Sequence, residues 1–296
     1  MKPLIRKTVQ FAAALACLSV AALADTPGKT LLVVAHPDDE YYFAATVYRM
    51  AVQLGGTVDE LIITNGEGGY RYSTLAEPYY GKQLTDEAVG RKELPAIRKQ
   101  EALNAGKILG IRNHYFLDQK DEKFTTDINE GLSHLWDPQF VENTIEDLCR
   151  GEHYQYIFTV LPRSTTHGHH QAATVLATRA IRQLPEDQRP VLLAADTDGS
   201  AYVPVAGVGE TNVWQSASAY AFDRNTTFGF QNSLSYQIVV SWMISEHKSQ
   251  GLLQTMHNKD PKEFYWVDDQ DTPAAAQAAA LLFRQVTPVP ATVTSQ

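Results

Sequence analysis

The stretch Thr30-Leu-Leu-Val-Val-Ala-His-Pro-Asp-Asp-Glu40 decides how the rest of the chain is interpreted. Residues 30–35 form an apolar run rich in Val and Leu, which predicts a buried β-strand. His36, Pro37 and three carboxylates follow at once, and Pro37 cannot continue a strand ladder. From Glu40, apolar residues recur at helical spacing as far as Gly55-Gly56. A strand, a tight turn and a helix in this order place the polar residues at the crevice where open α/β sheets bind ligands.

The residue types in this turn suit metal-assisted chemistry. His36 and Asp39 are three residues apart, so a nitrogen and an oxygen can reach one cation. Adjacent Asp side chains diverge, which leaves Asp38 free, and we assign it the transfer of a proton as a general base. The alternative is a solvated first turn of a helix, which Asp and Glu favour without any ligand. The His at the end of a buried strand favours the metal site.

Strand-like and helix-like segments alternate from residue 30 to about residue 200. We expect strands at 57–64, 113–118, 154–161 and 190–195, and helices at 40–54, 94–109, 140–150 and 171–184. This alternation predicts an α/β fold with a Rossmann-like, doubly wound, mostly parallel sheet, which forms a catalytic domain over residues 25–200.

The pattern loosens after residue 200. Residues 201–208 and 213–222 are β-like, and residues 234–253 predict one long helix. We therefore expect 201–286 to be an irregular, partly β extension of the same domain. Residues 287–296 lack periodicity and predict a flexible tail.

The segment 70–91 is polar, rich in Tyr and without clean periodicity, which predicts a long loop. Loops of this length in compact domains are usually functional. Tyr70 and Arg71 are candidates for a sugar-binding rim, because aromatic faces and polar tips suit carbohydrate. A surface loop with packed tyrosines is the alternative.

The amino terminus predicts export. Basic residues at positions 2, 6 and 7 precede an apolar run over 11–24 that ends in Ala22-Leu-Ala24. This is the pattern of a secretory signal peptide over residues 1–24, so we expect a secreted or periplasmic protein. The run is too short for a stable membrane helix, and no longer one follows.

The amino-acid composition limits the kinds of molecule that the protein is expected to bind. The formal net charge of −9 disfavours nucleic acid and anionic membranes as partners. Of the two cysteines only Cys149 lies beyond the predicted signal peptide, so no internal disulfide is expected. The oligomeric state does not follow from the sequence.

A second cluster, Pro162-Arg-Ser-Thr-Thr-His167-Gly-His-His170, follows the strand expected at 154–161. Three histidines within four residues at a strand exit favour a metal over core packing. His36, Asp39 and His170 would form a two-His, one-carboxylate face with open positions, although His169 could replace His170. With Zn²⁺ such a ligand set supports hydrolysis, and with Fe²⁺ a similar triad activates oxygen. A spare base at Asp38 favours hydrolysis.

Further segments repeat a known combination: Ala35-His-Pro-Asp-Asp-Glu40, Thr64-Asn-Gly-Glu-Gly68, Arg98-Lys-Gln-Glu-Ala102, Leu109-Gly-Ile111, Phe116-Leu-Asp118 and the pair His167 and His170. Over roughly residues 30–180 the chain resembles the PIG-L/LmbE-type zinc deacetylases of N-acetylglucosamine derivatives. The resemblance implies a Rossmann-like sheet and metal ligands at His36, Asp39 and His170. It implies that Asp38 activates water and then protonates the leaving amine.

The same resemblance implies that His167 stabilises the oxyanion or acts as an acid, and that Arg98 and Asp121 contact the substrate. One position departs from the family pattern. Members commonly carry Asp or Asn just before the second ligand histidine, where this chain has His169. The surroundings of His167 are therefore expected to differ from those in the family.

These observations predict an exported, metal-dependent amidohydrolase that removes an N-acyl group, with acetyl the leading candidate, from an amino sugar or glycan. Zn²⁺ is the expected cofactor, with Fe²⁺ or another divalent metal as the alternative. A non-catalytic carbohydrate-binding protein on the same fold is a second hypothesis. An amidase acting on another N-acyl conjugate is a third.

Overall fold

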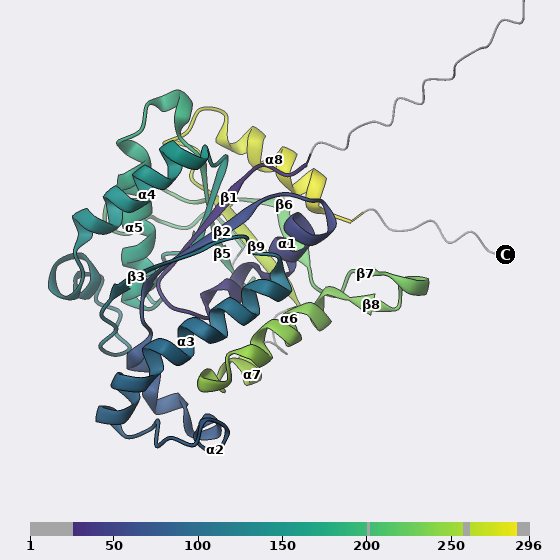
Figure 1. Cartoon of the computed structure of the whole chain (residues 1–296). Helices are drawn as coiled ribbons and strands as arrows, with labels where there is room; N and C mark the ends of the chain where they lie inside the picture. Colours follow the sequence, from purple (N-terminus) through teal and green to yellow (C-terminus); the bar gives the residue numbers. More distant parts are fainter. Residues whose placement is uncertain (1–25, 200–201, 257–260, 289–296) are drawn as a thin grey trace, which may run out of the picture.

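The computed structural model describes residues 26–199, 202–256 and 261–288 (Figure 1). The predicted signal peptide and most of the predicted tail lie outside the described residues. None of the helices in the described part of the chain has both the length and the apolar character that crossing a bilayer requires.

A seven-stranded sheet occupies the centre of the described structure, in the order β3-β2-β1-β4-β5-β9-β6. The first five of these strands are parallel, and β9 runs antiparallel to both β5 and β6. This confirms the predicted doubly wound, mostly parallel sheet, and β9 is a strand that the sequence analysis did not predict. The strands are β1 Thr30–Val34, β2 Val58–Thr64, β3 His114–Gln119, β4 Tyr156–Val160, β5 Val191–Asp196, β6 Gln215–Asp223 and β9 Lys262–Val267.

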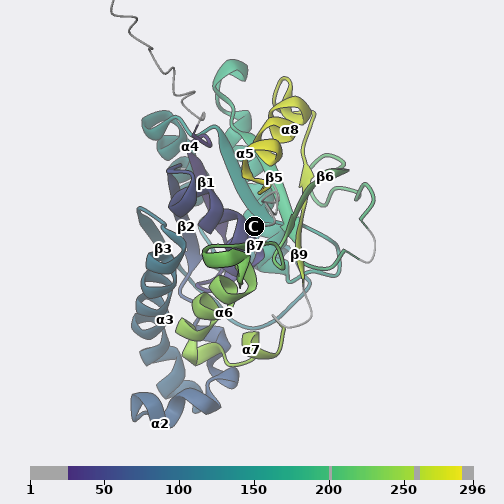
Figure 2. The same ribbon diagram turned by 90° about the vertical axis from the view of Figure 1, so that its right-hand side faces the viewer.

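Helices cover both faces of the sheet (Figure 2). Side chains alternate along a strand, so Leu32 and Val34 of β1 join one core, with residues of α1, α3, α6 and α8. Leu31 and Val33 join the other core, with residues of α4 and α5. Because both faces are buried, the strand is apolar throughout rather than alternating. The helices that pack on the sheet are α1 Ala44–Tyr48, α3 Glu87–Leu109, α4 Pro138–Glu152, α5 Gly168–Arg182, α6 Tyr236–Glu246 and α8 Ala275–Val286.

The strand order reverses between β1 and β4. The chain passes from β1 outward to β2 and β3, and then returns to β4 on the other side of β1. Ligand sites in open α/β sheets lie at such a point, beyond the carboxyl ends of the strands. The residues that follow β1 and β4, including His36 and the histidines at 167–170, therefore meet at one edge of the sheet.

The predicted long helix over 234–253 is wrong. A short β-hairpin, β7 Thr227–Phe228 with β8 Leu234–Ser235, precedes α6, which ends at Glu246. His247 then leaves the helical region, with φ −82° and ψ 59°, and its Nε2 lies 2.5 Å from Glu40 Oε1. Both side chains are fully buried, so the need to pair Glu40 turns the chain away from the helix axis. A 3₁₀ turn over Lys248–Gln250 and the short α7, Leu253–Met256, follow.

Other predicted boundaries also change. Residues 70–91 are not an irregular loop, because they contain 3₁₀ turns, α2 Glu77–Tyr80 and the start of α3. Asp86 begins α3 early, since its carboxylate accepts a hydrogen bond from the N–H of Val89. In the described part of 201–208, only an isolated bridge from Val205 to Trp214 is β structure. The β-like run at 213–222 is confirmed as β6.

Candidate active site

The turn after β1 locks Asp39 in one orientation. Its Oδ2 accepts hydrogen bonds from the backbone N–H groups of Ala35, at 3.0 Å, and His36, at 2.8 Å. Its Oδ1 lies 3.0 Å from Nε2 of His170. Burial alone would raise the pKa of the Asp39 carboxyl, but His170 and His36 beside it hold that pKa well below its ordinary value. Asp39 is therefore an anion with one oxygen directed at the histidines.

Three donor atoms meet beside this turn. His36 Nδ1 lies 3.2 Å from His170 Nε2 and 3.5 Å from Asp39 Oδ2. Tetrahedral ligands at the usual zinc–nitrogen bond length are separated by about 3.3 Å. The His36–His170 separation matches this value, and one ligand atom from each of His36, Asp39 and His170 lies within 4.8 Å of the others, so the three residues suit a divalent cation. These are the three residues that the sequence analysis named as metal ligands.

His169 lies on the other side of His36. Its Nδ1 is 3.2 Å from His36 Nε2, so it does not occupy the position of His170. Together with His167 it forms a second group in which donor atoms of His36, His167 and His169 lie within 4.8 Å of one another. Burial and the nearby His36 lower the pKa of His169 to about 3, so its ring is neutral.

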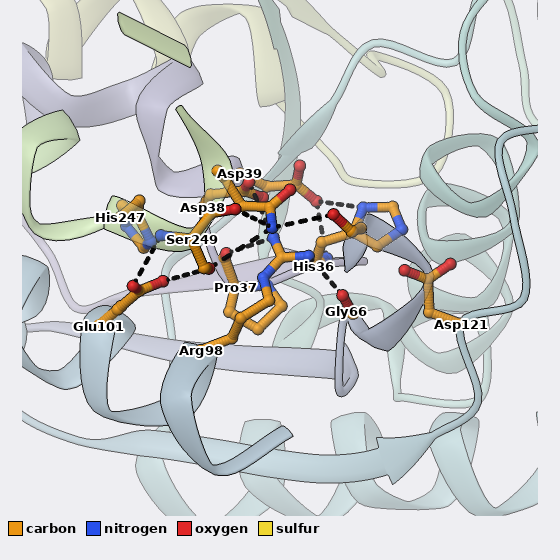
Figure 3. Close-up of polar contacts among 12 residues, drawn as sticks. His36, Pro37, Asp38, Asp39, Gly66, Arg98, Glu101, Asp121, His247 and Ser249 are labelled. Atoms are coloured by element: carbon orange, nitrogen blue, oxygen red, sulfur yellow. Dashed lines mark hydrogen bonds and ion pairs between the residues drawn. The ribbon is translucent and has the colours of Figure 1, made fainter. Parts of the chain in front are cut away.

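Asp38 points into the cavity from a strained backbone. Its φ of +149° with ψ −10° is a conformation that costs on the order of 1–3 kcal/mol for a residue with a side chain. Its carboxylate is 2.8 Å from Nη2 of Arg98 (Figure 3). Burial raises the pKa of the Asp38 carboxyl, while the Arg98 charge opposes that rise. A carboxylate with a raised pKa is suited to accept a proton near neutral pH.

Arg98 is turned towards the protein rather than towards open solvent. It is 2% exposed, and besides Asp38 it donates to the carbonyl oxygens of Pro37, at 2.8 Å, and Gly66, at 2.6 Å. Gly66 has φ +66°, and a Cβ there would lie 2.4 Å from Arg98 Nη1, so glycine is required. Arg98 thus ties the turns after β1 and β2 together around Asp38, which gives it a positioning role. It also lines the cavity, so the expected substrate contact stays a prediction.

The candidate catalytic residues line a cavity of about 260 Å³. Besides polar residues, the lining includes aromatic and leucine side chains, namely Tyr41, Tyr42, Tyr72, Phe124, Leu252 and Leu253. Tyr70 and Arg71 are not among its lining residues. Tyr70 is only 5% exposed and its ring lies 5.3 Å from the guanidinium groups of Arg71 and Arg91. From the Tyr-rich segment, Tyr72 reaches the cavity instead.

His167 and Asp121 also line the cavity. His167 Nε2 is 3.2 Å from the carbonyl oxygen of Lys123, and its ring stacks on Phe124 with centroids 5.0 Å apart. Burial and the neighbouring His36 lower the pKa of His167 to about 2. A contact with a carbonyl requires a proton on Nε2, so Nδ1 of the neutral ring is an acceptor. Asp121 Oδ2 accepts a hydrogen bond of 3.1 Å from the N–H of Gly68.

One wall of the cavity comes from a segment that the sequence analysis missed. Ser249 donates to the Glu101 carboxylate through its N–H, at 2.8 Å, and its Oγ, at 2.6 Å (Figure 3). This tie brings Gln250, Leu252 and Leu253 to the cavity. They fall within the stretch interpreted as one helix, so no local pattern marked them. Glu101 itself belongs to the segment 98–102 that resembled the deacetylases.

The fold and the donor set define an α/β protein with a candidate metal centre at the switch point of its sheet. The chain belongs to the PIG-L family, described as GlcNAc-PI de-N-acetylase, whose model matches residues 31–181. The match spans β1 to α5 and includes His36 and the histidines at 167–170.

Two curated relatives are similar to this chain, and both are named as probable N-acetyl-α-D-glucosaminyl L-malate deacetylase 2. The Bacillus cereus protein is 26% identical over 243 residues, which cover 80% of this chain and 93% of the relative. The Bacillus subtilis protein is 26% identical over 160 residues, which cover 54% of this chain and 63% of the relative.

Solved structures share the fold. The N,N'-diacetylchitobiose deacetylase from Pyrococcus horikoshii superposes with a TM-score of 0.52 at 16% identity, covering 82% of this chain and 86% of that one. A deacetylase triple mutant from the teicoplanin biosynthetic pathway has a TM-score of 0.52 at 15% identity, covering 81% of this chain and 97% of that one. At such low identity these similarities establish the architecture alone.

Proposed function

We propose that the chain is an exported, metal-dependent N-deacetylase that acts on an amino sugar or glycan. The observation that carries the proposal is the donor face of His36, Asp39 and His170 beside the Asp38 carboxylate in one cavity. Membership of the PIG-L family and the names of the Bacillus relatives support an N-acetylated glucosamine derivative as the substrate.

His36 Nδ1, Asp39 Oδ1 and His170 Nε2 would hold the cofactor, with Zn²⁺ favoured by two nitrogen donors and one carboxylate. Fe²⁺ or another divalent ion is the alternative. When bound, such an ion polarises the amide carbonyl and lowers the pKa of a water molecule towards about 7. Every other step is assigned to side chains of the protein.

Asp38 is the proposed base. It takes a proton from the attacking water as the oxygen of that water joins the carbonyl carbon, and it gives the proton to the nitrogen as the C–N bond breaks. Acetic acid and a free amine result, and the acid then ionises to acetate. The 2.8 Å contact with Arg98 holds the carboxylate in place through both transfers.

His167 receives a different role from the one that the family resemblance implies. Its Nε2–H is engaged with the carbonyl of Lys123, so Nδ1 can accept but not donate a hydrogen bond in the neutral ring. We therefore assign the return of the proton to Asp38. His167 positions the substrate by accepting a hydrogen bond from one of its hydroxyl or amide groups.

The cavity lining favours an uncharged substrate. Among the described residues that line it, Arg98 is the one cationic side chain of Lys or Arg type, and its contacts are with Asp38 and two backbone carbonyls. The aromatic and leucine side chains of the lining suit the apolar face of a sugar and an uncharged group attached to it. For the malate group in the names of the Bacillus relatives, the described lining offers no Lys or Arg side chain other than Arg98, which is already paired with Asp38.

The location proposed for this activity rests on the sequence alone. The basic start, the apolar run and Ala22-Leu-Ala24 support export, and hence a substrate in the cell envelope or outside the cell. A carbohydrate-binding protein without turnover is the competing hypothesis. The presence of Asp38 in the same cavity as the candidate ligands favours the enzyme.

The decisive measurement is acetate release from a panel of N-acetylated amino sugars and oligosaccharides, with Zn²⁺ and again after chelation. Chelator-sensitive release is expected. Release that chelation leaves unchanged would contradict the metal dependence. If no substrate in the panel releases acetate while one metal is bound per chain, the carbohydrate-binding protein or an enzyme for another acyl group is favoured. If no acetate is released and no metal is bound, the proposed metal site is contradicted.

A further inference from the structure

His36 has a second polar neighbour that the proposed reaction does not use. Its Nε2 lies 3.2 Å from Nδ1 of His169, a side chain that is fully buried against Trp136, with ring centroids 5.0 Å apart. A histidine that binds a metal through one nitrogen usually donates its other N–H to a carboxylate, a carbonyl or a water. In this chain an imidazole stands in that position.

The tautomers of the two rings follow from one another. If Nδ1 of His36 is to offer its lone pair beside Asp39 and His170, the proton of the neutral ring must be on Nε2. That N–H can donate only if Nδ1 of His169 is unprotonated. The proton of neutral His169 is then on Nε2, where it needs an acceptor.

Glu130 is the candidate acceptor. Its Oε2 lies 3.4 Å from His169 Nε2, and each of these buried atoms lacks a hydrogen-bond partner among the described residues. The two unpaired atoms are therefore placed to pair with one another. Asp121 Oδ1 is 3.5 Å from His169 Nδ1, on the side where His169 must present a lone pair. The direction of donation therefore runs from His36 through His169 to Glu130.

We infer that His169 and Glu130 are positioning residues that hold His36 in the tautomer with its Nδ1 lone pair facing Asp39 and His170. The inference rests on the proposed function, because it gives His36 the part of a metal ligand. It gives a role to His169, which stands at the position where the family commonly carries Asp or Asn. It also explains why a Glu at the start of the turn Glu130–Leu135 approaches a buried histidine.

A second metal ion is the competing explanation for the same geometry. His36, His167 and His169 could present nitrogens to one cation. If His36 also bound a metal through Nδ1, however, Nε2 would have to lose its proton, which makes the ring an imidazolate. The hydrogen-bonded chain requires no such deprotonation, and it uses the otherwise unpaired atoms of His169 and Glu130.

Two substitutions at His169 separate its two contacts. In His169→Asn the side-chain oxygen stands where Nδ1 was, so the acceptor for His36 is kept while the reach to Glu130 is lost. In His169→Gln the amide extends to the place of Nε2, so the contact with Glu130 is kept and the acceptor for His36 is lost. His134→Asn, an exposed histidine in the same turn as Glu130, is the control.

Zinc affinity by competition with a chromophoric chelator, together with zinc stoichiometry, is the readout. We expect His169→Gln to weaken zinc binding by about 10- to 100-fold. His169→Asn should restore most of that loss, Glu130→Gln should weaken binding by a few-fold, and His134→Asn should match wild type. Circular dichroism and thermal unfolding of each variant show that the affinities belong to folded protein.

Three results would overturn the inference. Equal affinities for wild type, His169→Asn and His169→Gln would show that the chain of hydrogen bonds does not act on His36. Two zinc ions per wild-type chain, with one lost in His169→Asn, would identify a second metal site instead. If the wild-type protein binds no zinc, both this inference and the proposed function are overturned. If the wild-type protein and the His169 variants all bind zinc equally tightly, the inference alone is overturned.

Discussion

The two turns that meet at the cavity are stabilised in different ways. The turn after β1 is held in part from within, since Asp39 accepts hydrogen bonds from the backbone of Ala35 and His36, four and three residues away along the chain. The cluster after β4 is held by distant groups, among them the backbone carbonyls of Lys123 and Thr125. The first turn carries part of its geometry in its own sequence, and Arg98 adds a distant support at Pro37 and Asp38. The second depends on how the rest of the chain folds around it.

This difference has a functional counterpart. The turn after β1 supplies the candidate ligand Asp39 and the candidate base Asp38, whose placement the reaction tolerates least. The segments assembled around it supply His167, the contacts of His169 and the wall that contains Leu252 and Leu253, which adjust the site and its substrate. Substitutions in the first turn should therefore cost the most, and those in the assembled wall the least.

His36→Ala affects both the turn after β1 and the cluster after β4, because it removes a candidate metal ligand and the partner of His169. Bound zinc should fall to background and acetate release should disappear. Metal content after gel filtration measures this directly, with His134→Ala as the exposed control. Full zinc stoichiometry in His36→Ala would contradict the assignment of the ligand.

Asp38→Asn breaks the chemistry of the first turn alone. The amide cannot accept the proton of water, so kcat should fall by roughly 10²- to 10⁴-fold while zinc content stays at the wild-type level. Steady-state kinetics and metal analysis on the same preparation measure the two effects separately. Asp187→Asn, on the surface, is the matched control. Wild-type kcat in Asp38→Asn would remove Asp38 from its role.

Arg98→Lys tests whether the first turn is fully self-contained. Lys keeps the positive charge but cannot reproduce the fork that contacts Asp38, Pro37 and Gly66 together. We expect kcat to fall by about 10-fold, with a smaller change in KM, because the base loses its support and the cavity keeps its lining. A variant with a raised KM and an unchanged kcat would instead return Arg98 to substrate binding.

Leu252→Lys probes the assembled wall and should have the smallest effect. Leu252 is 49% exposed at the cavity, so a lysine there can stay solvated and offer a cation to an anionic group. An exposed ion pair is worth up to about 1 kcal/mol, which corresponds to a few-fold lower KM for a malate-bearing substrate. Leu281→Lys, 47% exposed on α8, is the control. A wild-type preference for the malate-bearing substrate would contradict the uncharged substrate proposed above.

Several features could be predicted from sequence because their causes are local. Apolar runs of five to seven residues that end in polar clusters indicated the strands, and the spacing within residues 36–39 indicated the ligands and the base. His167 and His170 were found because they follow a strand exit. Their meeting with His36 required only the rule that parallel strands present their carboxyl ends at one edge.

Other features depended on contacts between distant segments. Tyr70 and Tyr72 are two residues apart and chemically alike, yet packing between Arg71 and Arg91 removes the first from the cavity while the second lines it. Residues 234–253 are apolar enough for one helix, but the buried carboxylate of Glu40 draws His247 out of it. A local sequence pattern does not show which distant residue will become the partner of a given side chain.

By itself, then, the sequence determined the parallel half of the sheet, the turn at residues 36–39 and the family to which those residues point. Tertiary structure decided that β9 enters the sheet between β5 and β6, that Arg98 supports Asp38, and that His169 lies between His36 and Glu130. The physical reason is the range of the interactions. Periodicity and turn chemistry act over a few residues, whereas burial forces each polar group to find a partner wherever the folded chain provides one.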